Sequence, residues 1–248
     1  MPSERTQFKK IAFLMPRSGM GLAEFHAYWR GTHGPTVAGA PDYAAYRSRY
    51  AQNHRIGDGP VGASFPYPGV AIFHLPGAGS NEAAFSASAT YRDHVRVDEL
   101  NFIDMDRTVS MAATEYVLRV GMGPAKLLVV GAGRDGLDRA EFDRRLLECC
   151  TAARSFAELA LGWTLNLVVQ GTLTLPGARP AEGFTVDFVQ ELWFASEDAL
   201  ASAYTVAAYR EHLAPAERDL FAPGRLFSFR AREFVFFDQG RLVPPLPG

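Results

Sequence analysis

Residues 91–94 read Tyr-Arg-Asp-His, and residues 209–212 read Tyr-Arg-Glu-His, 118 positions later. Two further matches have nearly the same offset. Ala23-Glu24-Phe25 returns as Ala140-Glu141-Phe142, and Glu115-Tyr116-Val117 returns as Glu233-Phe234-Val235. Self-similarity at a fixed period is the signature of a repeated architecture. The sequence therefore predicts a tandem duplication, with residues 1–120 as the first repeat and 121–248 as the second.

Each repeat carries the same order of patterns. A short apolar strand (10–15 or 126–130) leads through a glycine-containing turn into an amphipathic helix. A second strand (43–56 or 163–170), a Gly/Pro-rich loop, a third strand, a second helix and a closing strand follow. This β-α-β-β-α-β order is ferredoxin-like. We expect an α+β protein whose two sheets pack face to face as a dimeric α/β barrel made from one chain, with residues 120–125 as the connector.

Composition narrows the class of protein and of partner. The chain has 248 residues, 48% of them hydrophobic, and a formal net charge of -2, which is typical of a globular protein and gives no electrostatic footprint for nucleic acid. Two adjacent cysteines imply no disulfide framework, and no stretch approaches a membrane span. We expect a soluble cytoplasmic protein without a membrane or nucleic-acid partner. Pairing of two tandem chains into a homodimer stays open.

The first predicted helix carries a stripe of large rings. Phe25, Trp29 and His33 are spaced by four residues, which places them on the helix face that meets the sheet. The imidazole of His33 is then expected to point toward the interior of the protein. His26 on the same helix, and His74 at the end of the third strand, are expected to face solvent or to anchor loops.

The second predicted strand offers another imidazole. Alternation sets Tyr46, Tyr50 and His54 on one face of this strand and Asn53 on the other. His33 and His54 are thus expected to face one cleft with aromatic walls. Such a cleft suits a flat aromatic ligand, and imidazoles can move protons near neutral pH.

The alternative is that both imidazoles are core histidines bonded to backbone carbonyls. The repeat favours function, because the position that matches His33 is Cys150 and the position that matches His54 is Gly171. A structural pair has reason to persist in both repeats, whereas one functional cleft needs it once. His94 returns in the second repeat, which points to a structural role and makes it a weaker site candidate.

Other chemistries have little support. The glycines of residues 131–136 follow a strand and precede a helix, as in a dinucleotide-binding turn, but no strand ending in Asp or Glu follows at the required place. No His/Cys/acid cluster has metal-ligand spacing, and no G-x-S-x-G elbow occurs. We expect no metal and no cofactor.

The stretch 22–35, with its Glu24-Phe25, Tyr28-Trp29-Arg30 and Thr32-His33-Gly34-Pro35, resembles the EthD family, as do Gln52-Asn53-His54 and residues 98–104. The resemblance covers residues 8–118 well and 124–238 weakly. It implies a ferredoxin-like fold that pairs into a dimeric α/β barrel. Family members accompany ether-degrading oxygenases or are similar to dehydratases and decarboxylases of aromatic polyketides, and relatives on this fold isomerise lactones or oxidise anthrones without cofactors.

These observations lead to a hypothesis of a cofactor-free lyase or isomerase of secondary metabolism, acting on a small hydrophobic substrate of aromatic or polyketide origin. Two alternatives stay open: a non-catalytic accessory protein that binds an intermediate of an oxygenase pathway, and a cofactor-independent monooxygenase. The predicted site residues are His33 and His54 as general acid and base, with substrate contacts from Trp29, Tyr46, Tyr50, Asn53, His94 and Asp104.

Overall fold

The computed structural model describes residues 7–76, 81–170, 175–180, 184–239 and 241–243. In this part of the chain, eight long strands close into one antiparallel barrel, and pairing in a ring leaves none of them with a free edge. Their order around the barrel is β1 (Gln7–Leu14), β4 (Gly69–Leu75), β2 (Arg49–Asp58), β10 (Phe221–Asp238), β6 (Ala125–Gly133), β9 (Phe188–Phe194), β7 (Gly162–Val169) and β5 (Val109–Arg119), which pairs with β1 again.

Each half of the chain contributes four neighbouring strands, in the orders β5-β1-β4-β2 and β10-β6-β9-β7. The half-sheets face each other across a common interior and are also hydrogen-bonded along both edges, where β2 pairs with β10 and β5 with β7. The sequence did not predict this edge pairing. Three short strands, β3 (Ala63–Ser64), β8 (Arg179–Pro180) and β11 (Arg241–Leu242), add to β10 or β5.

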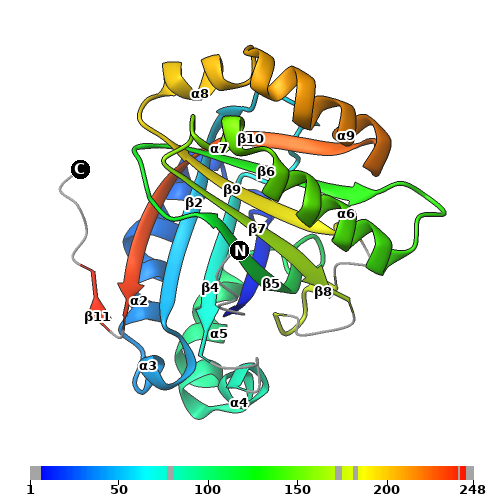
Figure 1. Ribbon diagram of the computed structural model, residues 1–248. Coiled ribbons are helices and arrows are strands. Elements are labelled where there is room, and N and C mark those ends of the chain that lie inside the picture. Colours follow the sequence, from blue (N-terminus) through cyan, green and yellow to red (C-terminus); the bar gives the residue numbers. More distant parts are fainter. Residues whose placement is uncertain (1–6, 77–80, 171–174, 181–183, 240, 244–248) are drawn as a thin grey trace.

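The helices lie on the outside of the barrel in two groups, which Figure 1 shows on opposite sides. One group is α1 (Leu22–Tyr28), the π-helix η1 (Trp29–His33), α2 (Gly34–Ala38), α3 (Tyr43–Tyr46), α4 (Asn81–Ala87), the π-helix η2 (Tyr91–Val95) and α5 (Arg96–Phe102). The other is α6 (Arg139–Ala152), α7 (Arg154–Ala157), α8 (Glu197–Ala203), the π-helix η4 (Tyr209–Leu213) and α9 (Ala214–Leu220). None of the helices in the described ranges is long and apolar enough to span a bilayer.

The predicted strand 43–56 was wrong at its beginning. Residues 43–46 form the helical turn α3, and β2 starts at Arg49. Asp42 has a left-handed backbone with φ 58°, which turns the chain before the helical residues. Tyr43 and Tyr46 then share one face as an i,i+3 pair, whereas strand alternation would place them on opposite faces.

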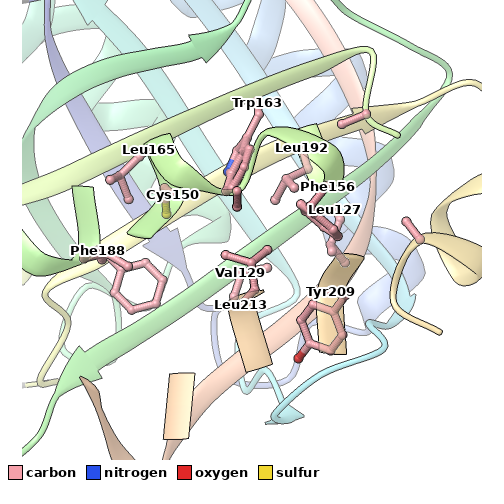
Figure 2. Close-up of a cluster of buried hydrophobic side chains, with 14 of the residues drawn as sticks. Leu127, Val129, Cys150, Phe156, Trp163, Leu165, Phe188, Leu192, Tyr209 and Leu213 are labelled. Carbon is pink, nitrogen blue, oxygen red and sulfur yellow. The ribbon is translucent and has the colours of Figure 1, made fainter. Parts of the chain in front are cut away.

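Strand alternation divides the buried apolar residues into three cores. Within β1, Ile11 and Phe13 point into the barrel, whereas Ala12 and Leu14 pack beneath the first group of helices. The second group of helices covers a third cluster on the far side of the barrel, part of which Figure 2 shows. A side chain on a barrel strand therefore reaches either the interior or a helix-covered outer layer, and this choice positions the candidate sites.

Candidate active site

His54 lies on the outer face of β2, beneath the helix α1–η1. Its ring stacks on Trp29 with centroids 4.3 Å apart and an angle of 24° between the planes, and it meets the edge of Phe234 at 5.0 Å. The indole of Trp29 in turn lies over Gly69 of β4, where an added Cβ would come within 2.2 Å of the ring. The imidazole is 5% exposed and is clamped between strand and helix.

Hydrogen bonds around His54 fix the tautomers. The side-chain nitrogen of Gln52 donates to the carbonyl of Trp29 and to the hydroxyl of Tyr50, each at 2.8 Å, so the amide oxygen of Gln52 faces His54. The Nε2–H of His54 donates to that oxygen at 2.9 Å. Its Nδ1 is therefore an acceptor and receives the Nδ1–H of His26 at 2.8 Å. The Nε2 of His26 is left as an acceptor at the outer end of the chain of bonds.

The position of His26 differs from the expectation of a solvent-facing or loop-anchoring side chain. The residue is half-buried, and its ring lies 4.9 Å from that of His54. The signal was present in the sequence, because His26, Trp29 and His33 follow an i,i+3,i+7 pattern and share one helix face. His74, for which the same was expected, instead projects into the barrel.

Burial governs the protonation of this histidine pair. Burial is the main cause that lowers the pKa of His54 to about 3, and the positive charges that His26, Arg30 and Arg232 can carry contribute to the same shift. Burial also lowers the pKa of His26. Both rings are therefore neutral at pH 7, and His26 can accept a proton there.

His33 belongs to a second polar cluster. Its Nδ1–H donates to Oδ2 of Asp98 on α5 at 2.6 Å, and the hydroxyl of Tyr28 donates to Oδ1 of the same carboxylate, also at 2.6 Å. The ring of His33 is 4% exposed and packs against Phe102 at 4.7 Å. Burial acts to raise the pKa of Asp98, but the hydrogen bonds from His33 and Tyr28 outweigh it and hold the pKa below its usual value.

The two predicted catalytic histidines thus lie on the same side of the sheet but in different surroundings. His54 is bonded to His26 and stacked on Trp29, whereas His33 is bonded to Asp98. Asp98 was not among the predicted site residues, and it comes from a helix 65 positions away.

The two tyrosines predicted to line the cleft, Tyr46 and Tyr50, also lie in different surroundings. Tyr50 is fully buried, stacks on Phe73 at 4.6 Å, and bonds to Gln52, so it supports the histidine pair from below. Burial raises its pKa, which keeps the hydroxyl protonated. Tyr46, on α3, packs instead against Phe85 at 5.2 Å.

Three further predicted contacts lie away from the histidine pair. Asn53 points into the barrel, where its amide donates to the carbonyl of Val70, on the opposite side of the sheet from His54. His94 is exposed on η2. Asp104 accepts the backbone N–H of Arg107 and so closes a turn.

A groove of about 680 Å³ is lined by Ala27 and Arg30, which follow His26 by one and four positions. Arg30 is the charged residue of its lining, and its guanidinium lies 4.2 Å above the ring of Phe234. The volume falls within the range of small-molecule sites, and the walls are mainly apolar. They are formed by Ala27, Arg30, Gly31, Pro35, Ala38 and Gly39 on the helical side and by Phe236, Leu242 and Val243 on the strand side.

The corresponding layer of the C-terminal half is filled. Cys150, which matches His33, lies in the apolar cluster with Phe156 and Trp163 (Figure 2), and the cavity beside it measures about 10 Å³. A cavity of this size holds at most about one water molecule, so the space around Cys150 offers no room for a substrate. Within the described residues, no group of three or more His, Cys, Asp or Glu side chains is arranged to hold a metal ion.

Comparisons with known proteins agree with this architecture. Residues 17–106 match the family model of the EthD domain, as the resemblance predicted. The fold is similar over its whole length to two proteins provisionally assigned as monooxygenases. The one from Lactobacillus acidophilus NCFM has a TM-score of 0.58 and 8% identity, covering 98% of this chain and 100% of that one. The one from Fusobacterium nucleatum has 0.55 and 6%, covering 99% of each. No curated protein matches the sequence.

Proposed function

We propose that this chain, which carries an EthD domain at residues 17–106, is a lyase or isomerase that moves protons on a small, apolar, aromatic substrate without a cofactor. The observation that carries the proposal is the bonded series Gln52–His54–His26, which leaves the Nε2 of His26 as an acceptor on the helix whose next turn, at Arg30, lines an apolar groove. A general base must be unprotonated at working pH and within reach of its substrate. The lowered pKa of His26 meets the first condition, and its half-exposed place on α1 meets the second.

The geometry supports a division of roles different from the predicted acid–base pair of His33 and His54. His26 takes a proton from the substrate at Nε2. The Nδ1–H of His26 stays bonded to Nδ1 of His54, and the low pKa of His54 keeps the added proton on His26. Return of the proton to another atom of the substrate gives an isomer, or assists a leaving group in an elimination. His33 acts as a positioning residue, because its bond to Asp98 ties η1 to α5.

Deuterium exchange tests this proposal without knowledge of the natural product. A panel of hydroxylated aromatic ketones is first screened by thermal shift, since a ligand of the native state raises apparent stability. Bound compounds are then followed by NMR in D2O for exchange at carbons beside the carbonyl. We expect exchange that the variant His26→Asn slows by about 100-fold or more, the usual contribution of a general base. His94→Asn, at an exposed position on η2, serves as the matched control and should exchange at the wild-type rate. Equal rates in His26→Asn and wild type would refute the role of His26.

Cofactor-independent oxygenation is a second candidate. The whole-length likeness of the fold to two proteins provisionally assigned as monooxygenases favours it. The same base would then deprotonate a phenol or enol, and the anion would react with dioxygen. Oxygen uptake in the presence of a bound compound distinguishes this reaction from proton transfer alone. A non-catalytic accessory protein would bind such compounds but give neither uptake nor exchange.

We also infer that residues 1–120 and 121–248 are two copies of one ferredoxin-like unit. The strand order of the two halves is the same, which supports this inference. So does a repeated buried bond: Tyr91 donates to Glu99 at 2.8 Å, and Tyr209 donates to Glu217 at 2.6 Å, with both residues of the pair shifted by 118 positions.

A further inference from the structure

A second cavity, of about 190 Å³, lies inside the barrel at the end where the connector residues Val120, Gly121 and Met122 cover it. It is on the opposite side of the sheet from the His26–His54 pair, because its strand residues are those that alternate inward. A single water needs only about 10–15 Å³ of such space, so the cavity has room for several waters or one small molecule.

Two lysines and three glutamates form the polar floor of this end of the barrel. Lys9 lies 2.7 Å from Glu191 and 3.0 Å from Glu115, and Lys126 lies 2.8 Å from Glu191 and 2.7 Å from Glu233. Burial acts to raise the pKa of Glu191, but the two lysines outweigh it and hold the pKa well below its usual value. These five groups satisfy one another and leave little capacity for a ligand.

Comparison of the two repeats separates the charged residues that occur in both from the residues that occur once. Lys9 matches Lys126, and Glu115 matches Glu233, at offsets of 117 and 118. Strand register places His74 opposite Lys9 in one half and Trp193 opposite Lys126 in the other. His74 therefore occurs once, as does its other cross-strand neighbour, Arg49 on β2.

Arg49 and His74 have unused hydrogen-bonding capacity at the cavity wall. The guanidinium of Arg49 lies 3.5 Å from Glu233 and 3.9 Å from Asp238, both longer than the 2.7–2.9 Å of a charge-assisted hydrogen bond. Within the described residues, the ring nitrogens of His74 have no hydrogen-bond partner. Burial and the charges of Lys9 and Arg49 lower the pKa of His74 well below its usual value, so the neutral ring offers one N–H donor.

The charges that line the cavity balance, with Lys9, Arg49 and Arg119 against Glu115, Glu191 and Glu233. Lys9 is bonded within the five-residue cluster, which leaves the guanidinium of Arg49 as the group that can meet an anion together with His74. The remaining wall is apolar and is made by Ala51, Ile72, Val117, Val120 and Met122.

We propose that this end of the barrel is a second ligand site, which binds a small monocarboxylate with an apolar body. The carboxylate lies on the guanidinium of Arg49 and the ring N–H of His74, because a planar guanidinium matches carboxylate geometry. The apolar body lies against Ile72 and Val117.

Titration calorimetry with benzoate tests the proposal on the full chain, with benzamide as the uncharged probe of the same shape. We expect benzoate to bind and benzamide to bind at least tenfold more weakly. Arg49→Gln and His74→Phe should each weaken benzoate binding about tenfold or more, because each removes a hydrogen bond to a charged group. Arg30→Gln, which alters the outer groove, is the matched control and should leave the affinity for benzoate unchanged.

Equal affinity for benzoate and benzamide would overturn the proposal, and so would loss of benzoate binding in Arg30→Gln alone. If Arg49→Gln fails to fold, a crystal soaked in 4-bromobenzoate decides the question on the wild-type chain. An anomalous bromine peak between β2 and β4 inside the barrel supports the site. A peak in the outer groove, or none, contradicts it.

Discussion

The buried imidazole of His54 should make the stability of the protein depend on pH in a calculable way. A histidine of the unfolded chain titrates near pH 6.5, whereas burial lowers the pKa of His54 to about 3 in the folded state. Between these values the unfolded state holds a proton that the folded state does not. The contribution of His54 to stability is therefore present above pH 6.5 and is lost as the pH falls below it.

At pH 5 the unfolded imidazole is 1.5 pH units below its pKa, and each unit corresponds to about 1.4 kcal/mol, so the loss is about 2 kcal/mol relative to pH 7. The ring is 5% exposed, so little solvent screening reduces this figure. His54→Gln removes the titrating group but keeps an amide that can donate to Gln52. The free-energy difference between wild type and His54→Gln should thus shift by about 2 kcal/mol between pH 7 and pH 5.

Urea denaturation at the two pH values, followed by far-UV circular dichroism, measures this difference. Phe188→Leu, in the core of the C-terminal half, is the control, since its cost comes from a cavity and should be equal at both pH values. If the wild-type difference from His54→Gln moves by less than about 0.5 kcal/mol, His54 is protonated in the folded state at pH 5, and the tautomer assignment on which the proposed mechanism depends is wrong.

Three further predictions test the packing around the candidate sites. Gly69→Ala should destabilise the protein by about 1–3 kcal/mol in urea denaturation and slow deuterium exchange, because the new methyl group displaces the ring of Trp29 from His54. Lys126→Met should cost about 3–5 kcal/mol by the same measurement, since it leaves Glu191 and Glu233 buried without this counter-charge. Asp98→Asn should lower the melting temperature through the loss of charge-assisted bonds from His33 and Tyr28, by about 1–3 kcal/mol in stability, while benzoate binding in the barrel stays unchanged.

The barrel could be predicted from the sequence, but the partners within the site could not. The 118-residue period and the strand alternation led to the α/β barrel and placed His54 on the helix-facing side of β2. Neither pattern says which distant carboxylate or imidazole a ring will meet. Asp98 reaches His33 from α5, and His26 reaches His54 from α1, through side-chain orientations that the packed helices set. The helical turn at Tyr43 was missed because the four-residue spacing of Tyr46, Tyr50 and His54 suits strand and helix alike.

The proposed duplication gives a physical reason why chemistry should concentrate in residues that occur once. A unit that is folded twice must satisfy the same packing and the same buried charges twice, and Lys9 and Lys126 meet that demand with nearly identical ion pairs. A site for a single ligand carries no such demand in the second copy. In the second half, the layer that corresponds to the one around His33 and His54 is packed with apolar side chains around Cys150. Apolar burial replaces the hydrogen bonds of the first half. On this reasoning, His26, His54, Arg49 and His74 are the residues to substitute first, because the framework of the barrel does not need them in both halves.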